Sequence, residues 1–251
     1  MAISVEGGYP VLDVSASARN VVTTSITVGS GANRLILVGC VNDHAASSVS
    51  SATFGGAALA IVPGTGRAHG TDYSEVEWWY KIAPATSTAN VVVNWSATFL
   101  AASVIYVLDG VDQATGVRNA AGTGVDSGTT ASDTVAGFTA GDYVLDLMSI
   151  DSTGHSPGVT GNNLVDFATQ SFGASTNEFR GSHNTTDGVM SWSWTTSGPN
   201  SHVAVAAIPA PTGQQLRPDA DITTTGWSST PLWSKIDEDP AGGDVITGTA
   251  S

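Results

Sequence analysis

Lysine, cysteine and positive charge are scarce in this sequence. Lys81 and Lys235 are the two lysines among eight basic residues, against 22 acidic residues, so the formal net charge is −14. The basic residues form no patch, and a surface of this charge repels phosphate backbones and anionic lipids. The composition therefore predicts neither nucleic acid nor a membrane surface as a partner.

The single cysteine, Cys40, lies inside the apolar run RLILVGCV, so no disulfide can form within the chain. A free cysteine in an apolar run is typically a buried core residue. A catalytic thiol needs an exposed, electropositive setting instead. We therefore expect Cys40 to be structural.

The first thirty residues have no basic segment followed by a long apolar run, and their first basic residue is Arg19. We therefore expect no Sec-type signal peptide and no membrane-spanning segment. The composition nevertheless resembles that of extracellular proteins. A virion protein made in a host cytoplasm and released by lysis fits both observations, and an extracellular or cell-surface protein trimmed of its signal is the alternative.

Helical periodicity is almost absent, whereas period-two alternation recurs along the chain. Gly, Pro, Ser and Asn clusters such as FGGAA, VPGTG, TAGDY and TTSGPN separate the alternating segments and predict turns. The predicted strands are 10–15, 20–28, 34–42, 50–54, 58–62, 75–82, 90–95, 102–109, 130–136, 143–150, 163–168, 177–183, 189–194 and 202–208.

The two halves of the sequence resemble each other. NRLILVGCVND (33–43) parallels GDYVLDLMSID (141–151), and 90–111 parallels 188–209, with an offset that falls from about 108 to about 99 residues. Segments 90–111 and 188–209 each place a Trp-containing strand before a turn and a long apolar strand. We interpret this as internal pseudo-symmetry, either within one two-sheet sandwich or between two tandem domains of about 100 residues.

The predicted fold is all-β: a jelly-roll-like antiparallel β-sandwich with internal pseudo-symmetry and an extended C-terminal arm. The sandwich covers 1–210, with pseudo-repeated halves of about 1–112 and 113–210, and the arm or the start of a further module covers 211–251. Strands that are apolar on both faces should lie between layers. The predicted core is Leu35, Leu37, Val92, Ile105, Val107, Val144, Leu145, Leu147, Val203 and Val205.

The strand EVEWWYKI carries one candidate site. Alternation places Glu75, Glu77 and Trp79 on one face, with the two carboxylates about 6.6 Å apart along the strand. If this is an outer face, the acids and the indole could bind a sugar or act as a glycosidase pair. The alternative is a solvated surface whose acids pair loosely with Lys81.

The sequence GHSPG (154–158) matches the serine-hydrolase pattern G-x-S-x-G, and Asp166 with His183 or His202 follows in a workable order. That pattern needs a helix after the serine, and no helical period follows. A loop is therefore the preferred interpretation. The five histidines lack metal-ligand spacing, and the acids of the tail lack EF-hand spacing. We predict no metal, no cofactor and no catalytic residues.

The segment LRPDADITTTGWSSTPLWSKIDEDPAGGDVI (216–246) resembles a segment of structural proteins of tailed bacteriophages, which reads L-R-P, an Asp, G-W, an apolar pair, I-D-E and D-x-I. In that family the segment usually opens a further β domain. The first 210 residues also resemble β-sandwich modules of phage virion and bacterial surface proteins, on NRLILVGCVND, ATFGGAAL, VEWWYKIAPA and YVLDGVDQATGV.

The resemblance implies a non-enzymatic virion component: a capsid decoration, head-fiber or spike protein that acts by packing against capsid proteins or neighbouring copies. Homo-oligomerisation, as a trimer, is the expected state. The alternative is an adhesive module for host-surface glycans. A polar segment of this kind can become ordered against a partner, with buried tryptophans as anchors. The predicted partner-binding residues are Arg217, Trp227, Leu232, Trp233 and Ile236.

Overall fold

A computed structural model describes residues 2–15, 17–44, 48–64, 67–70, 74–151, 154–172 and 177–211, together with the backbone of 237–238 and 244–245. The described residues form strands and turns and no helix, which confirms the all-β prediction. No helix among them is therefore a candidate for crossing a membrane. The chain divides into two compact units, Met1–Ala210 and Pro211–Ser251.

The first half of the larger unit, here called the N-terminal repeat, contains eleven strands within the described residues. They are β1 (Ser4–Val5), β2 (Val11–Val14), β3 (Arg19–Val28), β4 (Leu35–Asn42), β5 (Val49–Phe54), β6 (Ala57–Ala58), β7 (Ala60–Ile61), β8 (Arg67–Gly70), β9 (Ser74–Ile82), β10 (Ser87–Phe99) and β11 (Ala101–Asp109).

These strands wrap as a jelly roll. The inner sheet has the order β2-β11-β4-β9, and the outer sheet has the order β3-β10-β5-β6. Strands β2 and β11, near the two ends of the repeat, are thus neighbours in the inner sheet. Strands β3 and β10, the next ones inward along the chain, are neighbours in the outer sheet, as in a double-sheet jelly roll. Strand β1 extends the inner sheet beside β11, and β7 and β8 extend it beside β9.

The second half, the C-terminal repeat, has seven strands within the described residues. They are β12 (Ala121–Thr134), β13 (Tyr143–Asp151), β14 (Gly158–Val159), β15 (Leu164–Val165), β16 (Gln170–Phe172), β17 (Asn177–Asn184) and β18 (Val189–Ala207).

Strands β12 and β18 each run through two layers. Residues 200–207 of β18 pair with β13, yet Trp192 of the same strand donates a hydrogen bond to Asp146 of β13. Asp146 pairs with Ala204, twelve residues further along β18, and twelve extended residues would span about 40 Å. The strand must therefore bend back, and the β12–β18 pairing shifts register between Val125 and Thr130, where the bend lies.

We call the folded-back portion, residues 130–134 of β12 and 189–194 of β18, the outer flap. It pairs with β14, and it covers the outer face of the inner sheet β12-β18-β13-β17. The segment TTSGPN, expected to be a turn between two strands, lies instead inside the continuous strand β18. Gly198 and Pro199 lie at the register shift, where β18 bends back from the outer flap to the inner sheet while staying paired with β12.

The main strands of the two repeats correspond to each other. Leu35 pairs with Leu108 in the first repeat and Tyr143 pairs with Ala207 in the second, so equivalent residues lie 108 and 99 positions apart. These are the offsets found between the sequence halves. By the same pairings β4 corresponds to β13, β9 to β17, β5 to β14, and β10 with β11 to the two portions of β18. The predicted pseudo-symmetry is therefore present, with two layers in each half.

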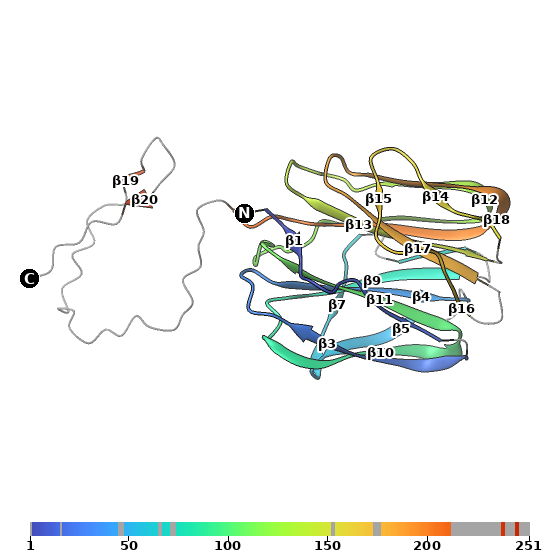
Figure 1. Ribbon diagram of the computed structural model, residues 1–251, viewed down its shortest axis with the longest axis horizontal. Coiled ribbons are helices and arrows are strands. Elements are labelled where there is room, and N and C mark those ends of the chain that lie inside the picture. The colour runs from blue at the N-terminus through green and yellow to red at the C-terminus, as the bar shows by residue number, and fades with distance from the viewer. Residues whose placement is uncertain are drawn as a thin grey trace, which may run out of the picture. The chain divides into compact units, whose positions relative to one another are not determined.

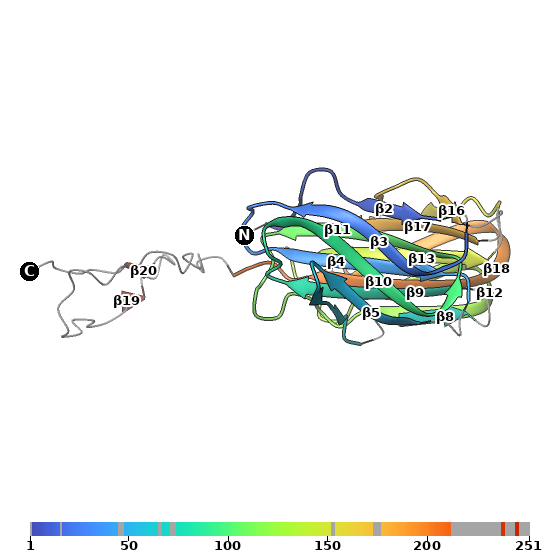
Figure 2. The ribbon, with the colours of Figure 1, turned by 90° about the horizontal axis from the view of Figure 1, so that it is seen from below.

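The repeats pack through their inner sheets, so the larger unit is a stack of layers (Figure 1; Figure 2 gives the view turned by 90°). Odd-numbered residues of β4, such as Leu35 and Leu37, join one hydrophobic cluster with Leu145, Leu147 and residues of β18. Even-numbered residues of β4 join a second cluster with β3, β5 and β10. Strands β4 and β11 are therefore buried on both faces, as their apolar sequences predict.

The predicted core is confirmed with one exception. Val92 is half-buried, whereas its neighbours Val91 and Val93 are buried. Strand β10 belongs to an outer sheet, so only one of its faces meets the core. The prediction assigned the buried face of this strand to the wrong alternate positions, and a shift of one residue moves a side chain to the opposite face.

The smaller unit, by itself, contains two described strands, β19 (Asp237–Glu238) and β20 (Asp244–Val245). They form an antiparallel pair in which Asp237 lies opposite Val245.

Candidate functional site

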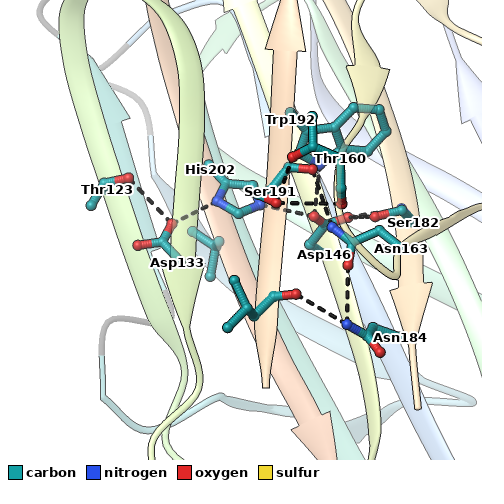
Figure 3. A network of polar contacts seen from close by, with 12 residues as sticks. Thr123, Asp133, Asp146, Thr160, Asn163, Ser182, Asn184, Ser191, Trp192 and His202 are labelled. Carbon is teal, nitrogen blue, oxygen red and sulfur yellow. Dashed lines mark hydrogen bonds and ion pairs between the residues drawn. The ribbon is translucent and has the colours of Figure 1, made fainter. Parts of the chain in front are cut away.

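A cluster of charged side chains lies inside the C-terminal repeat, between its inner sheet and the outer flap (Figure 3). At its centre, the Asp146 carboxylate accepts four hydrogen bonds. Ser182 N and Oγ donate to Oδ1 at 2.8 Å each, while Trp192 Nε1 and His202 Nε2 meet Oδ2 at 2.7 and 2.8 Å. Asp146 therefore joins strands β13, β17 and both portions of β18.

The other ring nitrogen of His202, Nδ1, lies 2.6 Å from Oδ2 of Asp133, which also accepts a hydrogen bond from Thr123 Oγ1 at 3.2 Å. Both imidazole nitrogens thus face carboxylates, and both can donate only when the ring is the doubly protonated cation. We therefore describe the group as an Asp133–His202–Asp146 network with a positive charge between two negative ones.

Burial by itself would lower the pKa of His202, which is completely buried. The hydrogen bonds and negative charges of Asp133 and Asp146 outweigh that effect and raise the pKa from 6.5 to about 9. The fold therefore stabilises the imidazolium over the neutral ring.

The network lies where apolar side chains would be expected. On the same face of β13, Val144 belongs to one hydrophobic cluster, and Met148 and Ile150 belong to another. Asp146 lies between them at 0% exposure. A buried charge is costly unless it is paired and hydrogen-bonded, which explains why Ser182, Trp192 and His202, the partners of Asp146, are all donors held by strands.

The N-terminal repeat has no counterpart of this network. The residues equivalent to Asp146 and His202, by the offsets of 108 and 99, are Val38 and Ser103. Val38 packs in the apolar cluster between the two N-terminal sheets, as does Val93, the equivalent of Trp192. The Asp133–His202–Asp146 network is therefore specific to the C-terminal repeat.

A second set of polar residues extends from the network toward β14 and the β17–β18 turn. Asn184 Nδ2 donates to Asn163 Oδ1 at 3.1 Å and to Asp187 Oδ1 at 2.8 Å, and Asn163 Nδ2 donates to the Ser191 carbonyl at 3.1 Å. These bonds attach the outer flap along its other edge. Together the two sets act as cross-links between layers, and their chemistry is that of a structural clamp.

A third polar contact connects the two repeats. Tyr106 of β11 donates a hydrogen bond to Asp166 Oδ2 at 2.7 Å, and the other oxygen of Asp166 contacts His183 Nδ1. Burial, and then the Asp166 carboxylate, raise the pKa of Tyr106 well above its usual value. Trp78 adds a bond from Nε1 to the Val203 carbonyl at 3.1 Å, also between repeats.

The serine-hydrolase pattern is not assembled by these residues. Asp166 does meet His183, but none of the described hydrogen bonds joins Ser156 to a histidine. Ser156 is exposed in a loop with a positive φ of 50°, and β14 follows it where the pattern needs a helix. The loop interpretation of GHSPG agrees with this placement.

The prediction that Glu75, Glu77 and Trp79 lie on an outer face is wrong. The three residues share a face, but β9 belongs to the inner sheet and that face meets the outer sheet, so Glu75 and Glu77 are 0% and 1% exposed. Glu77 accepts hydrogen bonds from Val49 N and Trp79 Nε1, each at 3.0 Å. Glu77 is an interior acceptor, and the two buried acids do not form an exposed glycan-binding surface.

The remaining predicted site residues, Arg217, Trp227, Leu232, Trp233 and Ile236, lie outside the described residues. Cys40 is buried, as expected from its apolar run. Within the described part of the chain, no three or more His, Cys, Asp or Glu side chains are grouped so that they could hold a metal ion.

No family model matches this chain. No curated protein matches it either. Among solved structures, the X-ray structure of Melon necrotic spot virus is similar with a TM-score of 0.22 and 9% sequence identity, covering 82% of this chain and 97% of that chain. A likeness at this level carries no argument, so the architecture above rests on the strand pairings alone.

Proposed function

We propose that the chain is a non-enzymatic structural protein of a virion, of the capsid-decoration, head-fiber or spike kind, which attaches through residues 211–251. The observation that carries this proposal is the division into two units. Within the described residues, the hydrophobic clusters of the larger unit end at Ala207, and the segment that resembles phage structural proteins lies further along the sequence.

The fold gives further support. Jelly rolls serve as capsid and lectin domains, which is an analogy at the level of the fold. The polar groups inside the C-terminal repeat are occupied with one another and cross-link its layers. Such an interior suits a protein whose task is to stay folded while attached to other proteins.

The attachment is tested by deleting residues 212–251 and measuring cosedimentation with particles that lack the protein. The truncated chain should melt cooperatively as an all-β protein and should no longer sediment. Retention at the full-length stoichiometry would disprove attachment through the segment. An unfolded truncated chain would show instead that the segment belongs to the sandwich.

Point variants in the full-length chain separate the two tryptophans from the rest of the segment. Trp227→Ala and Trp233→Ala should each weaken binding by about 30-fold, because a hot-spot truncation costs about 2 kcal/mol. The matched control is Ser228→Ala with Ser229→Ala, next to the first tryptophan, which should bind like the parent chain. Light scattering of the free protein tests the proposed trimer.

A further inference from the structure

We propose that the Asp133–His202–Asp146 network is a pH-sensitive latch that holds the outer flap on β13, closed while His202 carries both ring protons and released when it loses one. This inference does not depend on the virion role. It assigns a conformational function to a cluster that sequence patterns did not indicate.

The latch follows from which strands the bonds connect. Asp133 belongs to the flap and His202 to the inner layer, while Trp192 belongs to the flap and Asp146 to the inner layer. The bonds from both sides meet through the contact of His202 with Asp146 (Figure 3). Each flap strand is therefore tied to the inner sheet through one connected group of charges.

Loss of one imidazole proton turns one of the two attractive contacts between His202 and the aspartates into a repulsive one. A neutral ring has one donor and one lone pair, so one of the two carboxylates would face a lone pair at 2.6 or 2.8 Å. That carboxylate would be a buried charge without its donor, which is strongly unfavourable. Separating the flap from the sheet admits water to these groups and relieves the repulsion.

The other titratable residues that face this space come from β17 and from the loop before β14, where His155 is buried and its carbonyl accepts hydrogen bonds from Thr195 N and Oγ1. Arg180 lies on the same side as Ser182, with its guanidinium 5.8 Å from the centre of the Trp192 ring, and donates to the carbonyls of Pro157 and Phe167. Glu178, two residues earlier, accepts a bond from Gly154 N. Residues 158–159 and 189–194 contain no titratable side chain. His202 is the histidine that lies directly between the two aspartates, so its loss of a proton is the charge change on which the latch depends.

The direction of the pH effect follows from the raised pKa. The folded protein holds the proton up to about pH 9, whereas an unfolded histidine releases it near 6.5. The stabilisation is thus present in full below pH 6.5 and is lost as the pH rises through 9. Between pH 6 and pH 9 the folding equilibrium constant should fall by roughly a hundredfold from this residue alone.

The first test is denaturant unfolding at pH 6 and pH 9. The parent protein should lose roughly a hundredfold in its folding equilibrium constant, and His202→Gln, which is neutral at both pH values, should lose most of that dependence. The matched control is His183→Gln, which removes a partly exposed histidine that also contacts an aspartate; a loss of pH dependence as large as that of His202→Gln would show that the effect does not come from the network. Equal pH dependence in the parent and His202→Gln would overturn the latch.

The second test locates the opening. Hydrogen exchange at a fixed pH of 7 should be faster in His202→Gln than in the parent for 130–134 and 189–194, and unchanged for β4 and β11. Uniform acceleration, or none, would show that no flap is released. If the variant does not fold, nitrogen NMR of the imidazoles in the parent protein decides: one histidine should titrate near pH 9, and a spectrum in which none titrates near pH 9 would refute the proposal.

Discussion

Replacing Gly39 by alanine tests the packing of the two repeats against each other. Gly39 lies on β4, and its equivalent in the C-terminal repeat is Leu147, so the two meet near the centre of the stack. A methyl group at position 39 would overlap Leu147 Cδ1 and lie 3.2 Å from Trp78 Cη2. Leu147 and Trp78 are both fully buried. Overpacking of this kind costs about 1–3 kcal/mol.

A second substitution makes the prediction specific. Leu147→Ala alone should cost about 2–5 kcal/mol, because it leaves a cavity. In the double variant the new methyl at position 39 occupies part of that cavity, so the combined cost should fall below the sum by about 1–2 kcal/mol. The assay is urea unfolding followed by tryptophan fluorescence and far-UV circular dichroism, which also checks two-state behaviour.

The matched control is Gly158→Ala in β14, where a Cβ atom would meet nothing within 4 Å. Its free energy of unfolding should change by no more than about 0.5 kcal/mol. The reasoning is refuted if the costs of Gly39→Ala and Leu147→Ala add within about 0.3 kcal/mol, because that result would mean that the two positions do not touch.

Three further substitutions or reactions probe other buried contacts. Trp78→Phe leaves the Val203 carbonyl without its donor and should lower the free energy of unfolding by about 1–3 kcal/mol in the same urea assay; an unchanged midpoint would contradict the bond. Glu77→Gln should destabilise by a similar ~1–3 kcal/mol because an amide replaces an interior acceptor, and an unaltered melting temperature would argue for an exposed side chain. Burial, and then the neighbouring Glu77 and Glu75 carboxylates, raise the pKa of Cys40 well above its usual value. At pH 8 its thiol should therefore react with a disulfide reagent only after denaturant is added. Rapid labelling of the native protein would contradict its place in the core.

Much of the fold could be predicted because it depends on local patterns. Period-two alternation located most of the long strands, and runs apolar on both faces, such as RLILVGCV, identified the central strands. The offsets between the halves also followed from sequence, since equivalent strands keep similar apolar patterns. The bend in β18 was missed because Gly198 and Pro199 are turn residues in most contexts, and what keeps the strand continuous there is pairing with β12.

The candidate site could not be predicted in the same way. Asp146 and His202 are 56 residues apart, and their contact depends on two strands being neighbours. One signal was present: each is a titratable residue inside an otherwise apolar strand, YVLDLMSI and SHVAVAAI, where burial demands a partner. Glu75 and Glu77 show the converse error. Polar residues on alternate positions predict solvent, yet here a second sheet covers them, and Val49 of that sheet donates a hydrogen bond to Glu77.

Mass spectrometry of purified particles from the source tests the proposed function most directly. The account predicts peptides from both 1–210 and 211–251, at a fixed ratio to the major capsid protein from one preparation to the next. A chain that remains in the unassembled soluble fraction, with no peptides in purified particles, would contradict it.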